Sequence, residues 1–183
     1  MLTAVLPDQL RNVPLFRQFS PDEIGQILAR CETITQQAGD IVLQSGDRER
    51  ALYVLVEGTI EVVLEIPGLE ESIISTLAPG SVFGEGSFFH DAPHAATVRS
   101  TSAATLVRLR RTEFDALLKE DSLPAYRLGL NAAEILASRL HTTDQWVCQL
   151  LGEERSAVAA SWRRFREGLG GSFDFPRGFT HTT

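Results

Sequence analysis

The sequence has few of the residues that cross-link or anchor a small protein. Only two cysteines, Cys31 and Cys148, occur among its 183 residues, far apart and without metal-ligand spacing. No disulfide framework or zinc site is therefore predicted, which fits a reducing compartment. The chain has no run of about 18 apolar residues that could span a membrane. Its first residues are too polar for a signal peptide and are soon interrupted by Pro7, so we expect a soluble cytoplasmic protein.

A basic excess is also absent. The chain has 17 Lys and Arg residues against 24 Asp and Glu residues, a formal net charge of -7. Proteins that bind nucleic acid or anionic membranes usually carry the opposite balance, so neither DNA nor a membrane is an expected partner. Hydrophobic residues make up 43% of the chain, which is enough for the core of one domain with an appended segment.

The first clear helix signal lies at residues 20–31. Ser20 caps the helix, Pro21 takes the first helical position and Glu23 can reach back to the cap. Four side chains then recur on one helical face: Ile24, Ile27, Leu28 and Cys31. The residues just before predict a shorter helical piece that ends at Pro14.

Residues 33–111 have the pattern of short strands. Runs of β-branched residues between glycine-containing turns occur at 40–44, 51–57, 59–65, 72–78, 96–100 and 104–109. Ile60, Val62 and Leu64 recur at every second position, which predicts a half-buried strand. The Glu57–Gly58 pair between two runs predicts a hairpin turn. Together these features predict a mainly β fold with flanking helices: a sandwich, barrel or jelly roll.

The chain after residue 111 is predicted to be helical. Thr112 is the expected cap of a short helix, and Pro124 opens a longer one that Gly152 ends or kinks. A second amphipathic piece follows, with Trp162 and Phe165 on its apolar face. The remaining tail has no periodicity and is expected to be flexible.

The stretch VFGEGSFFHDAPHAATVRS, residues 82–100, carries the functional signal. Gly84 and Gly86 follow a strand and enter a helical turn, where backbone N–H groups converge beside the positive end of the helix. Small residues return along the facing segment: Ala95, Ala96 and Thr97. Two nearly bare backbone segments form a nest for an anion the size of a phosphate. In that nest, the Glu85 carboxylate could accept a hydrogen bond from a sugar hydroxyl beside the phosphate. A phosphodiester anion next to a free 2'-hydroxyl is the combination found in a cyclic nucleotide.

This stretch resembles the phosphate-binding cassette of cyclic nucleotide-binding domains, the module of catabolite-activator-type regulators, protein kinase A regulatory subunits and gated channels. The matching motifs are FGEGS at 83–87 and PHAATV at 93–98. The resemblance covers residues 13–150. It implies a double-stranded β-helix, or jelly-roll barrel, with a long C-terminal helix.

The implied organisation has four parts. Residues 1–32 form an N-terminal helical segment, and residues 33–111 form the β-roll with its cassette at 82–99. Residues 112–151 form the C-terminal helices of the domain. Residues 152–183 form the amphipathic helix and flexible tail.

The resemblance also implies the roles of the site residues and a ligand, cAMP or cGMP. Glu85 would bind the ribose 2'-hydroxyl, and Thr143 would meet the base. Val82, Phe83 and Val98 would form walls of the pocket. The phosphate would lie against backbone amides of the cassette: Gly84, Glu85, Gly86, Ser87, Ala95 and Ala96.

Two residues depart from the family pattern. His94 stands where the family has an arginine that pairs with the cyclic phosphate. Arginine is always charged and forks onto two oxygens, whereas an ordinary histidine titrates near pH 6.5 and offers one donor in a given direction. Losing a charge-assisted contact costs about 1.5–3 kcal/mol, roughly ten- to a hundredfold in affinity. Gly86 replaces a hydrophobic residue that couples the cassette to the barrel in the family, which implies a looser coupling here. The two changes bear on nucleotide affinity and signalling, not on the fold.

Several of these signals have a purely structural interpretation. Glu85 could serve only as a helix-capping carboxylate, and His94 could be an ordinary exposed loop histidine. His90 and His94 are four residues apart, but the predicted turn between them argues against a metal site. The arginines at 108, 110 and 111, and those at 163, 164 and 166, are expected on solvated faces.

Two functions fit these observations. The first is a sensor module whose ligand shifts the long helix and so changes a contact with a protein partner in trans, through that helix and the Trp162–Phe165 face. The long helix could also form a homodimer. The second is an interaction or scaffold protein that keeps the fold without its ligand. DNA binding is not expected, because only 31 residues follow Gly152. An enzyme is not expected either, because no nucleophile–base set, carboxylate pair or metal cluster is evident.

Overall fold

The computed structural model of the chain describes residues 5–65 and 71–153. Contacts divide the chain into two units, Met1–Ala137 and Ser138–Thr183. The amphipathic helix and flexible tail predicted within 152–183, with Trp162 and Phe165, lie almost entirely outside the described residues. The four-part division of the chain stays a prediction.

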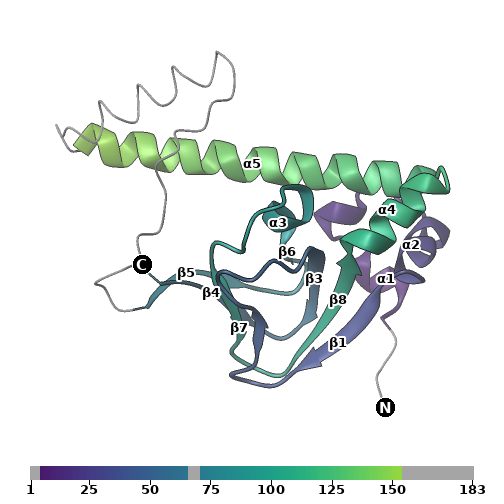
Figure 1. Ribbon diagram of the computed structural model, residues 1–183, viewed down its shortest axis with the longest axis horizontal. Helices are drawn as coiled ribbons and strands as arrows, with labels where there is room; N and C mark the ends of the chain where they lie inside the picture. Colours follow the sequence, from purple (N-terminus) through teal and green to yellow (C-terminus); the bar gives the residue numbers. More distant parts are fainter. Residues whose placement is uncertain (1–4, 66–70, 154–183) are drawn as a thin grey trace. The chain divides into compact units, whose positions relative to one another are not determined.

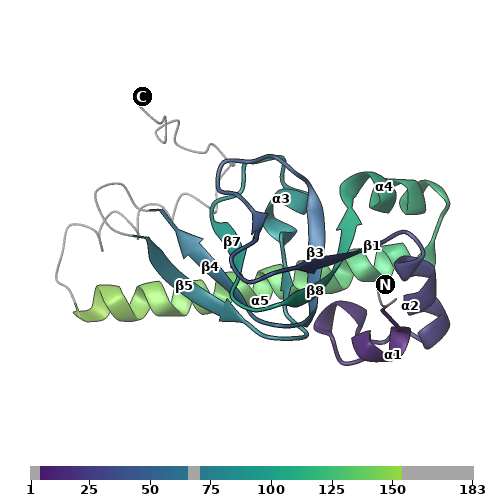
Figure 2. The ribbon, with the colours of Figure 1, turned by 90° about the horizontal axis from the view of Figure 1, so that it is seen from below.

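The first unit is built on two four-stranded antiparallel sheets (Figure 1; Figure 2). One has the order β1-β8-β3-β6 and the other the order β2-β7-β4-β5. Among the described strands, each successive pair changes sheet except β4 and β5. This alternation is that of a double-stranded β-helix, so the predicted jelly-roll fold is confirmed. The strands are β1 (Glu32–Gln36), β2 (Ile41–Leu43), β3 (Ala51–Glu57), β4 (Ile60–Leu64), β5 (Ser72–Leu77), β6 (Val82–Phe83), β7 (Thr97–Ser100) and β8 (Ala104–Arg110).

The connection at Glu57–Gly58 crosses between the sheets, and the hairpin predicted there is wrong. β3 pairs with β6 and β8, whereas β4 pairs with β5 and β7. Gly58 has a φ of 91°, and a Cβ on it would lie 2.4 Å from the carbonyl oxygen of Ala103. The glycine therefore permits a close approach to the β7–β8 connection. A turn signal between two apolar runs does not say whether the runs pair.

The alternation predicted for β4 holds only in part. Ile60 and Val63 are buried, whereas Val62 and Leu64 are half-buried. The pairing register between β4 and β5 shifts between Val62 and Val63. Such an irregularity moves the following side chains to the other face of the sheet. The buried residue after Ile60 is therefore Val63, not Val62 or Leu64.

One predicted helix end is confirmed, and two others are wrong. Ser20 Oγ accepts the Glu23 N–H at 3.2 Å, and Glu23 accepts the Ser20 N–H at 2.8 Å, which is the predicted capping box. Pro14 begins a 3-10 turn instead of ending a helix, and Arg110, not Thr112, is the cap before α4. The helical elements are α1 (Pro7–Leu10), η1 (Pro14–Phe16), α2 (Pro21–Leu28), α3 (Glu85–Phe89), α4 (Arg111–Lys119) and α5 (Leu123–Glu153).

The β1-β8-β3-β6 sheet has a hydrophobic core on each face. Along β3, Leu52 and Val54 pack toward the helices, while Tyr53 and Leu55 pack toward the other sheet. The helix-side core also contains Phe88 of α3 and residues of α1, α2, α4 and α5. The cassette helix is thus built into the same core as the N-terminal and C-terminal helices of the first unit.

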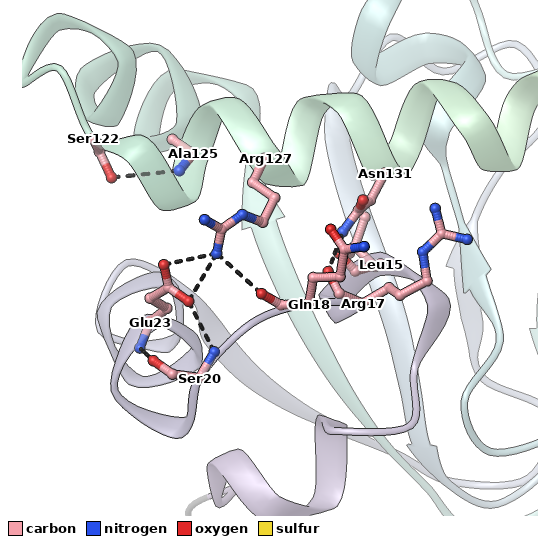
Figure 3. Close-up of polar contacts among 9 residues, drawn as sticks. All are labelled: Leu15, Arg17, Gln18, Ser20, Glu23, Ser122, Ala125, Arg127 and Asn131. Carbon is pink, nitrogen blue, oxygen red and sulfur yellow. Dashed lines mark hydrogen bonds and ion pairs between the residues drawn. The ribbon is translucent and has the colours of Figure 1, made fainter.

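Polar contacts tie the start of α5 to the N-terminal helices (Figure 3). Arg127 Nη1 donates to both carboxylate oxygens of Glu23, at 2.7 and 2.9 Å. The side-chain amide of buried Asn131 donates to the carbonyl oxygens of Leu15 and Arg17, at 2.9 and 3.0 Å. The backbone N–H of Ser20, together with Arg127, holds the pKa of Glu23 below its ordinary value.

The lowered pKa of Glu23 predicts a pH dependence of folding. A carboxyl with a lowered folded-state pKa stabilises the fold above its unfolded pKa and loses that contribution as the pH falls through the folded pKa. In urea unfolding, the wild-type chain should therefore lose more stability between about pH 6 and pH 3 than Glu23→Gln. Asp22→Asn removes a carboxylate from the same helical turn and is the matched control for the change in charge. Equal pH dependence of Glu23→Gln and wild type would contradict this.

Candidate functional site

The cassette begins at a glycine that the backbone requires. Gly84 is the cap of α3 and has a φ of 81°. A Cβ at this position would lie 2.5 Å from the carbonyl oxygen of Ala51 and 3.0 Å from the ring of Tyr53. Residue 84 must therefore be glycine for β6 to turn into α3 this close to β3.

The returning side of the cassette is joined to the β2–β3 connection. The His94 N–H donates to the carbonyl oxygen of Asp47 at 2.8 Å, and the Gly46 N–H donates to the His94 carbonyl at 2.9 Å. Thr97 Oγ1 accepts the Ser45 N–H at 3.1 Å and the Gln44 side-chain amide at 3.2 Å. The Thr97 side chain thus stabilises the junction between the cassette and the β2–β3 connection.

Two amides on this returning side have no hydrogen-bond acceptor within the described residues. They are the backbone N–H groups of Ala95 and Ala96. Ala95 is exposed and Ala96 half-buried. Small side chains leave both amides uncovered, as an anion nest requires.

His94 is buried, so its interpretation as an exposed loop histidine is wrong. The side chain is 8% exposed, and Nδ1 lies 3.0 Å from Ser87 Oγ of α3. Nε2 is buried and has no hydrogen-bond partner among the described residues. A buried ring nitrogen left in this state is costly, and a ligand or an ordered water at this point would satisfy it.

The cassette concentrates the buried polar side chains of the domain. Six polar or charged residues are buried in the described part of the chain, and four of them lie between residues 85 and 97. They are Glu85, Ser87, His94 and Thr97. Glu85 is the first residue of α3, where the positive end of the helix favours a carboxylate. Buried polar groups at this density are characteristic of a binding site rather than of a packed core.

The remaining predicted site residues lie in different surroundings. Phe83 stacks on Tyr53 with ring centroids 5.1 Å apart and shares the inter-sheet core with Val98. Val82 points to the opposite face of β6, into the helix-side core, and so lies away from Phe83. A Cβ on Gly86 would meet nothing within 4 Å, so this position packs against neither sheet. Thr143 belongs to the second unit, where its hydroxyl donates to the Arg139 carbonyl at 2.9 Å.

Within the described residues, no three His, Cys, Asp or Glu side chains are grouped as metal ligands. No helix in that part of the chain combines the length and apolar character needed to cross a bilayer.

Comparison with known proteins decides the family. The model of the cyclic nucleotide-binding domain matches residues 34–121. The Cyclic AMP receptor protein of Thermus thermophilus is 30% identical over 166 residues, which cover 90% of this chain and 75% of that protein. The chain belongs to the cyclic nucleotide-binding domain family. A cAMP-dependent protein kinase regulatory subunit of Emericella nidulans is 35% identical over 109 residues, 60% of this chain and 26% of that subunit.

Solved structures of the family share this architecture. The catabolite activator protein of Thermus thermophilus superposes with a TM-score of 0.68 at 28% identity, over 75% of this chain and 62% of that one. A cyclic nucleotide-binding domain from Methylobacillus flagellatus superposes with a TM-score of 0.72 at 17% identity, over 82% and 85% of the two chains. The second likeness concerns the fold alone. The chain spans only part of the activator protein and of the kinase subunit.

Two arginines hold α3 of this cyclic nucleotide-binding domain in place. Arg111 was predicted to lie on a solvated face, and no role was predicted for Arg50. Arg50 donates to the carbonyl oxygens of Ser87 and Phe88, at 3.2 and 3.0 Å. Arg111 donates to the Phe88 carbonyl at 2.9 Å and to the Asp115 carboxylate at 2.8 Å. Guanidinium groups thus satisfy the C-terminal carbonyls of α3. No sequence pattern predicted this role, because both arginines lie outside the cassette.

Arg108 is a further correction to the predicted solvated face. Its side chain is 18% exposed and bridges Glu32 and Glu49. Arg108 also lowers the pKa of Glu32 through its hydrogen bond. Of the three neighbouring arginines, Arg110 alone is largely exposed, at 49% of its side chain.

The contacts of Arg111 predict a stability difference between neighbouring arginines. Arg111→Met removes a charge-assisted cap from α3 and leaves Asp115 unpaired, so it should destabilise the domain by about 1–3 kcal/mol. Arg110→Met removes a surface ion pair and should cost less than about 1 kcal/mol. Urea unfolding of the two variants tests this. Equal effects would contradict the assigned role of Arg111.

Proposed function

We propose that the cassette binds a cyclic nucleotide, cAMP or cGMP, and that the chain is a regulatory binding module rather than an enzyme. One observation carries the proposal. Glu85, Ser87 and His94 are buried in one short segment, beside the unpaired amides of Ala95 and Ala96. Hydroxyl-binding and anion-binding groups at this spacing suit a sugar joined to a phosphodiester. Receptor and regulatory proteins among the relatives support the same assignment.

Each part of the ligand has a proposed partner in the cassette. Glu85 would accept a hydrogen bond from the ribose 2'-hydroxyl. The amides of the α3 turn, Gly84 to Ser87, and those of Ala95 and Ala96 would hold the phosphate, with His94 as its charge partner. Val82 and Phe83 are the proposed walls, although they face different cores. The base contact assigned to Thr143 stays a prediction, because Thr143 belongs to the second unit.

The proposed signal leaves the cassette through α3. Phe88 of α3 packs on Phe114 of α4 with ring centroids 5.3 Å apart, and Arg111 joins the end of α3 to Asp115 of α4. A ligand that binds one position of α3 more tightly would therefore also favour one arrangement of the helices behind it. The proposed mechanism is a shift in the population of these arrangements.

The proposed output is a contact made by α5, either with a protein partner in trans or with a second copy. Large apolar side chains on its first turns are exposed at coiled-coil spacing, with exposed fractions of 63% for Leu123, 47% for Tyr126 and 71% for Leu130. Further along α5, Leu140 and Trp146 are exposed at 61% and 66%. Exposed apolar side chains gathered on one helix suit a protein partner better than solvent.

A second candidate function is an interaction protein that keeps this fold without binding nucleotide. The observation that favours it is His94 in the arginine position. A single imidazole supplies less charge and fewer donors than a guanidinium.

Calorimetric titration with cAMP and cGMP separates the two functions. The binding module should show saturable heat, weakened at least tenfold in Glu85→Gln and unchanged in Glu57→Gln, an exposed carboxylate at the end of β3. His94→Arg should bind about ten- to a hundredfold more tightly than wild type.

A different result would favour the second candidate function. A folded wild-type chain that gives no heat with either nucleotide up to millimolar concentration, and no gain in His94→Arg, would favour the interaction protein.

A further inference from the structure

The pairing of Ser87 with His94 limits what the imidazole can offer to an anion. His94 Nδ1 lies 3.0 Å from Ser87 Oγ, which in turn lies 3.3 Å from the carbonyl oxygen of Gly84. A carbonyl oxygen only accepts, so when the hydroxyl donates to Gly84 its lone pairs face Nδ1, which then carries a proton. A neutral ring in this state carries a lone pair at Nε2, which repels a phosphate oxygen. Only the doubly protonated ring donates from both nitrogens.

We infer that His94 takes up a proton when the cassette binds a phosphodiester, and that Ser87 is the positioning residue that holds the ring for this purpose. The inference rests on the proposed function. Nε2 is buried without a partner in the part of the chain that the structure describes, and a phosphate oxygen would satisfy an N–H there. An adjacent anion favours the charged ring, in which Ser87 Oγ still accepts the Nδ1 proton. The proton comes from the buffer acid, and no bond of the ligand changes.

Other charges near His94 are largely engaged elsewhere. Arg48 lies 3.7 Å from Asp91, and Arg50 donates to carbonyl oxygens of α3. Glu49 accepts from Arg108 at 3.1 Å. The charged and titratable residues on the segments packed against His94 are Asp47, Arg48, Glu49, Arg50, Glu85, His90 and Asp91. Both arginines thus have protein acceptors, and of the two histidines His94 is the buried one, next to the amides of Ala95 and Ala96.

Linked protonation has a consequence that an arginine would not have. Nucleotide affinity then falls as the pH rises, by at most tenfold per pH unit, which is the limit for one linked proton. A permanently charged guanidinium gives no such slope. The module would therefore respond to nucleotide and proton concentration together.

The test is calorimetry of cAMP binding at about pH 8 in two buffers that differ in ionisation enthalpy, which counts the protons taken up. Wild type should take up a substantial fraction of one proton per cAMP, and His94→Arg should bind with none. Ser87→Ala should take up fewer protons and bind several-fold more weakly, with Ser87→Thr restoring both. Thermal unfolding confirms that each variant is folded.

His90→Gln is the matched control, because His90 is an exposed histidine on the same connection. It should take up protons like wild type. Wild-type binding without proton uptake, or uptake that persists in His94→Arg, would overturn the inference and leave nucleotide binding intact. If neither wild type nor His94→Arg binds cAMP or cGMP, the proposed function itself fails.

Discussion

The candidate site depends on how one short helix, α3, is fixed at both ends. At its start, Gly84 adopts a backbone conformation and a closeness to β3 that no other residue allows. At its end, Arg50 and Arg111 satisfy carbonyl oxygens that the helix leaves unpaired. A five-residue helix has little stability of its own. Its position, and with it the geometry of the cassette, is therefore set by its neighbours.

The same constraint gives the cassette a physical route to the helices. Phe88 is fully buried among apolar residues of the N-terminal and C-terminal helices of the first unit. Any displacement of α3 must then repack that core, because protein interiors contain little free volume. Arg111 adds a polar connection along the same path, since it contacts both the end of α3 and Asp115 of α4.

Local sequence patterns predicted the fold well where the interaction is local. The Ser20 capping box and the short strands were found because their signals lie within a few residues. The Glu57–Gly58 hairpin was wrong, because the choice of strand partner depends on residues far along the chain. The phase change in β4 was missed for a related reason, since a bulge arises from pairing with β5.

The backbone of the candidate site was easier to predict than the contacts of its side chains. Glycines and small residues at 84–87 and 95–97 indicated the cradle directly. The burial of His94 and its pairing with Ser87 depend on the β2–β3 connection, which has no motif that marks it. Arg50 and Arg111 were not identified because their partners are backbone carbonyls, which any sequence supplies.

The central claim is that the uncovered amides of the cassette receive the phosphate of a cyclic nucleotide. The most direct measurement is the backbone amide NMR spectrum of the ¹⁵N-labelled chain during titration with cAMP. The amide protons of Ala95 and Ala96 should move downfield as they gain a charged acceptor, while those of Gly39 and Gly80, in turns elsewhere on the roll, stay in place. Saturable binding that leaves Ala95 and Ala96 unmoved would contradict the account.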